Sequence, residues 1–206
     1  MALHSVPAPS RTFDSRHTAD DCAFCAAFCR GVTTMVVNAG TCDGLREKDL
    51  VAQTDLTRGV FSRHMGDMQR CLVTTYVRLA DVLLTRFEDV LLASPTWEQG
   101  MRDGIIDGIR ALDEEPGQAF FYFVAADRSR DPVMWLERRV VQERFVHALV
   151  TAPFDGTFDT IRSEMFSGAL QSTIRARLLS DGDFGDYTAL TSDVEALLDV
   201  FQPSRD

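Results

Sequence analysis

Apolar residues recur every three or four positions through most of this 206-residue chain, and this spacing constrains the fold more than any other feature. Such spacing places apolar side chains on one face of an α-helix. It is clearest between Asp67 and Ala93, where the apolar face consists of Leu72, Tyr76, Leu79, Val82, Leu83, Phe87, Val90 and Leu91. The run Phe120–Val124 is ambiguous between strand and helix, but its neighbours favour helix. The sequence therefore predicts an all-α fold.

Glycines, prolines and capping residues divide the chain into further helices. Helical patterning begins near Thr18, with Asp20 and Asp21 in the first turn, and Gly40 ends that helix. The other predicted helices are Arg46–Thr54, Thr57–Met65, Asp67–Ala93, Thr96–Leu112, Gln118–Asp127, Asp131–Val150, Thr157–Leu179 and Ser192–Phe201. The first 17 residues lack periodicity and are predicted to be a flexible arm.

Charge and composition exclude several classes of protein. The 31 acidic and 21 basic residues give a net charge of −10, which argues against a general polyanion binder. Residues 1–76 are neutral overall, so the net negative charge lies in the rest of the chain. Five cysteines are too few, and odd in number, for a disulfide scaffold. Neither a secretory leader nor an apolar stretch of roughly 18–20 residues is present, so we expect a cytoplasmic protein without a membrane partner.

Two short helices joined by a tight turn form the most informative segment. The predicted helix Arg46–Thr54 precedes Thr57–Met65, in which Thr57 is the N-cap and Val60 and Phe61 face inward. The second helix exposes Thr57, Arg58, Ser62, Arg63 and His64. Helix-turn-helix modules place their second helix in the DNA major groove, where an arginine can bind guanine O6 and N7. On spacing alone, a merely solvated surface remains an alternative.

The segment Thr57-Arg-Gly-Val-Phe-Ser-Arg-His-Met-Gly-Asp-Met-Gln-Arg-Cys-Leu72 resembles the signature Ser/Thr-Lys/Arg-Gly-Thr-Phe-Tyr-Arg-His-Phe-x-Asp-Lys-x-x-Leu of the TetR family of transcriptional regulators. The resemblance covers roughly residues 20–76 and extends to Leu50, Val51, Ala52 and Leu56. It implies a homodimer in which each N-terminal domain binds half of a palindromic operator in double-stranded DNA. It also implies a helix-turn-helix domain at 18–66, an effector-binding and dimerisation domain at 67–206, and a repressor released by a small-molecule effector.

The same resemblance indicates which residues contact DNA: Arg46, Lys48, Thr57, Arg58, Gly59, Ser62, Arg63, His64 and Arg70. Ser62 stands in place of a phosphate-binding tyrosine and Met68 in place of a lysine. Each lost phosphate contact reduces the slope of log affinity against log salt concentration by about 0.9. Asp55 replaces the turn glycine, although aspartate tolerates a left-handed backbone, and Met65 replaces a phenylalanine. The basic residues that can compensate are Arg11, Arg16, Arg46, Lys48 and Arg70.

These departures leave a second function open, in which a TetR-like fold has lost specific DNA binding and acts as a ligand- or protein-binding module. Ser62, Met68 and the neutral N-terminal part favour this alternative, whereas the intact motif residues Arg58, Gly59, Phe61, Arg63 and His64 oppose it. No phosphate-binding loop, nucleophile elbow or metalloprotease motif is present, so we expect neither an enzyme nor a cofactor.

Three cysteines, Cys22, Cys25 and Cys29, lie on one face of the first helix. Core packing is the favoured interpretation, because small apolar cysteines pack well and no second Cys or His pair follows at zinc-finger spacing. We therefore predict no metal site. A redox regulator that uses Cys22 and Cys25 is a third hypothesis for the function.

The predicted effector pocket contains Phe87, Trp97, Met101, Phe121, Trp135, His147 and Phe166. The primary role of such residues is to pack in the core. The family resemblance implies that some of them also line a pocket for a small apolar or aromatic effector. For His147 a buried, hydrogen-bonded side chain is favoured over an effector contact. The dimer interface is predicted to be a four-helix bundle that uses Leu170, Ile174, Leu178, Val194, Leu197, Leu198 and Phe201. Effector binding would tilt the helix at 67–93 and change the separation of the two recognition helices.

Overall fold

The computed structural model describes residues 22–115, 117–152, 159–181 and 187–201, and within these ranges it contains helices and no strand. The all-α prediction is therefore confirmed. The elements are α1 (Ala23–Ala39), α2 (Glu47–Thr54), α3 (Arg58–His64), α4 (Met68–Ala93), α5 (Trp97–Asp113), α6 (Gln118–Phe120), the π-helical turn η2 (Phe121–Ala125), α7 (Ala126–Arg128), α8 (Pro132–Thr151), α9 (Thr160–Asp181) and α10 (Tyr187–Phe201).

Polar side chains cap the helices at the places that the sequence indicates. Thr57 Oγ1 accepts a hydrogen bond from the Val60 N–H at 3.3 Å, as expected for the N-cap of α3. Asp67, Thr96 and Asp131 cap α4, α5 and α8 in the same manner. These caps satisfy backbone N–H groups that lack partners within the helix, which fixes where each helix begins.

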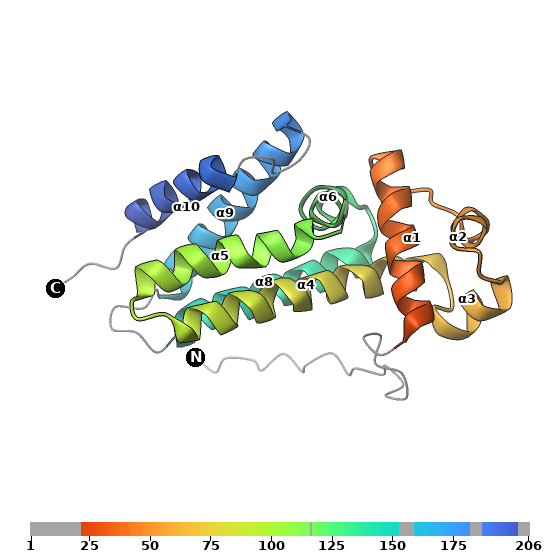
Figure 1. Ribbon diagram of the computed structural model, residues 1–206, viewed down its shortest axis with the longest axis horizontal. Coiled ribbons are helices and arrows are strands. Elements are labelled where there is room, and N and C mark those ends of the chain that lie inside the picture. Colours follow the sequence, from red (N-terminus) through yellow and green to blue (C-terminus); the bar gives the residue numbers. More distant parts are fainter. Residues whose placement is uncertain (1–21, 116, 153–158, 182–186, 202–206) are drawn as a thin grey trace, which may run out of the picture.

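Helices α1, α2 and α3 form a small group at one end of the molecule (Figure 1). Phe28 of α1 meets Phe61 of α3 edge to face, with 5.2 Å between the ring centroids, and both side chains are fully buried. Leu50 of α2 and Met65 complete this core. Since α1 also contacts α4, the group is joined to the rest of the molecule through both packing and the chain.

The long helix α4 leads away from this group and pairs with α5 (Figure 1). Gly104 permits the close approach, because a Cβ there would lie 2.9 Å from the Phe87 carbonyl oxygen. Helix α8 packs along α4, while α9 packs on α8. Of the predicted apolar face of α4, Val82 alone is exposed.

The segment from Gln118 to Arg128 is helical, in agreement with the prediction, but its middle turn is a π-helix. The run that was ambiguous between strand and helix lies in this turn, where Phe121, Phe123 and Val124 are buried. A π-helical turn redirects side chains within a helix, and here it points two phenylalanines into the core.

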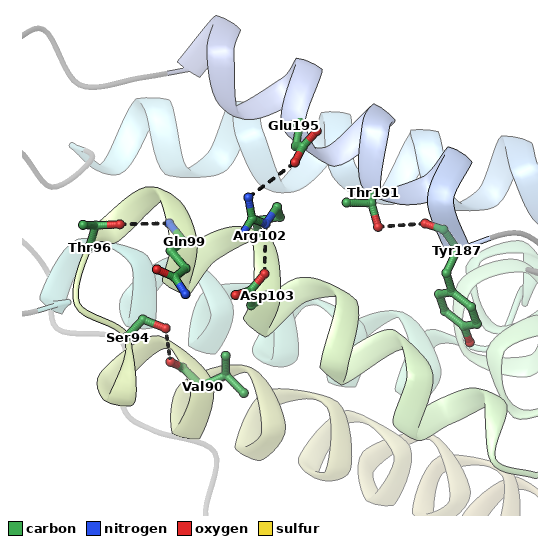
Figure 2. A network of polar contacts seen from close by, with 9 residues as sticks. All are labelled: Val90, Ser94, Thr96, Gln99, Arg102, Asp103, Tyr187, Thr191 and Glu195. Carbon is green, nitrogen blue, oxygen red and sulfur yellow. Dashed lines mark hydrogen bonds and ion pairs between the residues drawn. The ribbon is translucent and has the colours of Figure 1, made fainter.

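Helix α10 begins at Tyr187, before the predicted start at Ser192. Tyr187 donates a hydrogen bond to the Asp113 carboxylate of α5 at 2.8 Å, and its ring lies 5.0 Å from the guanidinium of Arg110. Figure 2 shows a second link between these helices, in which Arg102 bonds Glu195 at 3.4 Å. Contacts to α5 thus add the first turn to α10.

For five of its seven residues, the predicted composition of the dimer interface is wrong. Leu170, Ile174, Leu178, Val194 and Leu198 are buried within a single chain, whereas Leu197 and Phe201 are half-buried. The five buried side chains face the core between α9, α10 and the helices that these two pack on, α8 and α5. They therefore cannot form an outer surface. Periodicity identified an apolar face but could not tell which partner covers it.

Both ends of helix α1 lie within the described residues. Helix α1 begins at Ala23 with Cys22 as its N-cap, whereas Asp20 and Asp21 lie outside the described residues, as does the predicted arm. Gly40 ends α1 in a left-handed conformation, as predicted. No helix within the described residues is long and apolar enough to cross a membrane.

Candidate nucleic-acid interface

Two residues, Asp55 and Leu56, and the N-cap Thr57 join helices α2 and α3. The turn depends on the left-handed backbone of Asp55. Asp55 follows α2 with φ 53° and ψ 18°, a left-handed conformation that aspartate tolerates. Thr57 then caps α3, and Phe61 anchors α3 against α1. Because Phe61 and Met65 face inward, the opposite side of α3 is presented to solvent.

That solvent-facing side carries the residues predicted to contact DNA. Thr57, Arg58, Gly59, Ser62 and Arg63 are all exposed. Arg46 and Lys48 of the α2 N-terminus and Arg70 of the first turn of α4 are exposed as well. Eight of the nine predicted positions therefore lie at the surface of three successive helix ends, and whether they contact DNA stays a prediction.

Carboxylates of α2 hold two of these arginines. Arg58 Nε donates to Glu47 Oε1 at 2.9 Å, and Arg46 Nε donates to Asp49 Oδ2 at 2.7 Å. The Arg58 side chain is 83% exposed, so its terminal nitrogens face solvent while Nε is anchored. An arginine oriented in this way loses less conformational freedom when it binds a base or a phosphate.

Gly59 lies in the first turn of α3 with open space around it. A Cβ at this position would have Thr57 Oγ1, at 3.9 Å, as its nearest neighbour within the chain. The protein's own packing therefore does not require glycine here. A small residue on the exposed face of a recognition helix leaves room for the helix backbone to approach a partner closely.

His64, the ninth predicted DNA contact, lies at the last turn of α3 and is half-buried against α1. Its Nδ1 is 3.3 Å from Cys22 Sγ and 3.9 Å from Cys25 Sγ. Its ring centroid is 5.2 Å from that of Phe24. The sequence does not reveal the proximity of His64 to these cysteines, because some forty residues separate them and only the packing of α3 on α1 brings them together.

The cysteines fall into two groups by environment. Cys25, Cys29, Cys42 and Cys71 are buried free thiols, which confirms the core-packing interpretation for Cys25 and Cys29. Burial raises the pKa of Cys25 and of Cys42 to about 12. For Cys22, burial also raises the pKa, but hydrogen bonds from Cys25 and from the Phe24 backbone outweigh it and the pKa is lowered. Cys22 is also the one cysteine of the five that is half-buried rather than buried.

The residues predicted to bind an effector do not gather in one place. Trp97, Met101, Phe121 and Phe166 are buried in the core, and Phe87 adjoins a small apolar cavity of about 40 Å³ between α4, α5 and α8. Trp135 and His147 of α8 instead line a larger cavity of about 580 Å³. His147 is exposed there, so the expectation of a buried histidine is wrong.

Charged groups and aromatic rings share the walls of this larger cavity. Tyr76 of α4 stacks on Tyr122 with 4.9 Å between centroids. Asp127 pairs with Arg138 of α8 and with Arg175 of α9. The cavity walls also carry Arg139, Glu143 and Glu164. Sequence periodicity missed these polar residues because it identifies apolar faces only. Arg139, Glu143 and Glu164 are exposed and resemble ordinary solvated residues, whereas Asp127 and Arg138 are half-buried.

Two solved structures are similar to this chain over most of its length. One is a TetR family transcription regulator from Marinobacter aquaeolei VT8, 14% identical, with a TM-score of 0.66 over 87% of this chain and 95% of that chain. The other is a transcriptional regulator of the TerR/AcrR family from Aquifex aeolicus VF5, 13% identical, with a TM-score of 0.60 over 86% and 98% of the two chains. This chain has the TetR-family fold. No protein-family model and no curated protein matches the sequence.

The TetR-family fold agrees with the resemblance found in the sequence, although the two rest on different observations. The sequence resemblance concerns the motif in α3 and the start of α4, whereas the structural similarity covers 87% of the chain and so extends well beyond the motif. The helices after the motif carry no signature of their own, so only their arrangement relates them to the TetR fold.

Proposed function

We propose that this protein is a TetR-like, DNA-binding transcriptional regulator that acts as a homodimer. The observation that carries the proposal is the exposed face of α3, on which Arg58 is oriented by Glu47 and Gly59 leaves the helix backbone open. Helix α3 enters the major groove, and Arg58 near its N-terminus binds a base edge. In this proposal 18–66 is the DNA-binding domain and 67–206 the effector-binding and dimerisation domain.

The electrostatics of the molecule support this orientation on DNA. All of the net charge of −10 lies after residue 76, so a polyanion repels the larger part of the molecule and tolerates the neutral N-terminal part. Arg46, Lys48 and Arg70 flank α3 and supply phosphate contacts. Because Ser62 and Met68 supply none, affinity depends on few phosphates and falls less steeply with salt than in a regulator that keeps both contacts.

The dimer forms through the outer faces of α9 and α10. A shallow groove between these helices is lined largely by small or apolar side chains, namely Thr173, Ala176, Ser180, Ala196, Leu197 and Val200. Small side chains allow helices of two subunits to approach closely, and Val200 is 77% exposed in the single chain. This surface replaces the buried residues that periodicity alone suggested.

The cavity of about 580 Å³ is the proposed effector site, and repression released by the effector is the proposed mode of action. Its aromatic rings and its arginines suit an aromatic molecule that carries a polar group. Tyr76 is a residue of α4 and lines the cavity, and α4 directly follows α3 in the chain. A ligand that moves Tyr76 shifts α4 and thereby the separation of the two recognition helices in the dimer.

Binding-site selection from a random duplex library at low salt tests the proposal. We expect the wild type to enrich a palindromic motif and Arg58→Ala to lose it. The matched control is Arg86→Ala, because Arg86 is also an exposed arginine beside one carboxylate, Asp107, at 4.0 Å, but it lies near the end of α4 that is remote from α3. Enrichment that survives in Arg58→Ala would show that Arg58 does not read bases. An absence of enrichment by the wild type would favour a module that has lost DNA binding.

A further inference from the structure

Three side chains with metal-binding atoms converge where the beginning of α1 meets the end of α3. Cys22 is the N-cap of α1, Cys25 lies in its first turn, and His64 is the last residue of α3. The two sulfurs and one imidazole nitrogen all lie within 4.8 Å of one another. Cys22 and His64 are half-buried and Cys25 is buried, so an ion held here would be partly shielded from water.

The distances match those between ligands of a tetrahedral ion. A thiolate sulfur at 2.3 Å and an imidazole nitrogen at 2.0–2.1 Å from Zn²⁺ lie about 3.5 Å apart. The two sulfur–nitrogen distances here are 3.3 Å from Cys22 and 3.9 Å from Cys25. Each of these two distances differs from that value by a few tenths of an ångström, which side-chain rotation can supply, and the two sulfurs lie within 4.8 Å of each other.

We propose that Cys22, Cys25 and His64 form a binding site for one thiophilic metal cation of the Zn²⁺ type, with a fourth position open to water. Two sulfur ligands and an imidazole select such a cation over Mg²⁺ and Ca²⁺, which require oxygen ligands. The Cys25 backbone N–H donates to Cys22 Sγ at 3.4 Å, and such a donor stabilises the negative sulfur of a bound thiolate. Binding a divalent cation displaces the two thiol protons into solution.

The ion would tie the last turn of α3 to the first turn of α1. Phe61 anchors the middle of α3 in the core, and at its last turn His64 packs against the ring of exposed Phe24. A metal bridge there fixes the orientation of α3 relative to α1. Its effect on DNA affinity rests on the proposed function, whereas metal binding itself does not.

Titration of the reduced, metal-free full-length protein with Co²⁺ under anaerobic conditions tests the site without any DNA. Co²⁺ takes the place of Zn²⁺ in such sites, and thiolate ligation produces a charge-transfer absorption band in the near ultraviolet. We expect one Co²⁺ per chain with this band and its loss when Zn²⁺ is added. Cys22→Ala and His64→Gln should each weaken binding at least tenfold.

The matched control is Cys29→Ala, which removes a thiol one turn further along α1 and keeps all three ligands. It should bind Co²⁺ as the wild type does. Circular dichroism verifies that each variant is folded, and two ligand variants on different helices guard against the misfolding of either one. The proposal is overturned if the wild type gives no thiolate band, or if the band persists unchanged in Cys22→Ala and His64→Gln. A protein that binds Co²⁺ but no DNA supports this site and refutes the proposed function alone.

Discussion

Replacing Gly59 by alanine separates a requirement of the fold from a requirement of DNA binding. Gly59 is helical and exposed, and a Cβ there would be 3.9 Å from Thr57 Oγ1, an ordinary contact distance. The variant therefore introduces no clash within the protein. Because alanine loses less backbone entropy than glycine when a helix forms, Gly59→Ala should stabilise the folded state.

The expected gain is about 0.5–1 kcal/mol in the free energy of unfolding. For a chain of this length 1 kcal/mol corresponds to about 2–4 °C in the melting temperature, which differential scanning calorimetry resolves. Gly31 provides the contrasting case, since a Cβ there would lie 2.7 Å from Leu50 Cδ1 and 2.6 Å from Thr54 Cγ2. Gly31→Ala must displace the side chains of Leu50 and Thr54 and should cost about 1–3 kcal/mol.

DNA affinity should move in the opposite direction from stability in Gly59→Ala. If the backbone of α3 lies against DNA, the added methyl group enters an occupied space at a cost of about 1–3 kcal/mol. This corresponds to an affinity about 5- to 150-fold lower, measured by fluorescence anisotropy on the selected operator. A more stable variant with unchanged affinity would refute the close approach of Gly59 to DNA. A less stable variant would refute the structural argument itself.

Three further substitutions test the turn, the phosphate contacts and the dimer. Asp55→Gly should raise the free energy of unfolding by up to about 1 kcal/mol, because φ at this residue is +53°; a lower melting temperature would contradict this. Ser62→Tyr should increase the slope of log affinity against log salt by about 0.9, and an unchanged slope would show that position 62 does not face a phosphate. Val200→Asp should give monomers in sedimentation velocity while Leu92→Asp, at an exposed apolar site on α4, stays dimeric. A dimeric Val200→Asp protein would place the interface elsewhere.

The sequence by itself determined the features that depend on neighbouring residues. The N-cap at Thr57, the left-handed turn at Asp55 and the end of α1 at Gly40 all agree with the structure. Each results from a bond or a backbone preference that spans at most four residues, so the local sequence contains the necessary information. The apolar stripe of α4 was predictable for the same reason, because one helix face repeats at fixed intervals.

The tertiary structure decided which surfaces those helices bury. Ile174 of α9 and Leu198 of α10 each belong to an apolar face that the sequence predicts. The packing of α9 and α10 on the rest of the chain places both side chains in the core and leaves Val200 outside. Likewise Trp135 and His147 meet charged residues at a cavity, while Trp97 does not reach it. A stripe records that a face is apolar, and it carries no information on which partner covers that face.

The juxtaposition of His64 with Cys22 and Cys25 depended on tertiary structure most of all. In the sequence Cys22 and Cys25 had no second pair of ligands nearby, and His64 belonged to a different motif. The edge-to-face contact of Phe28 with Phe61 docks α3 on α1 and brings the last turn of α3 to the first turn of α1. Hydrophobic packing between helices, which acts without regard to separation along the chain, created a cluster that no spacing rule could anticipate.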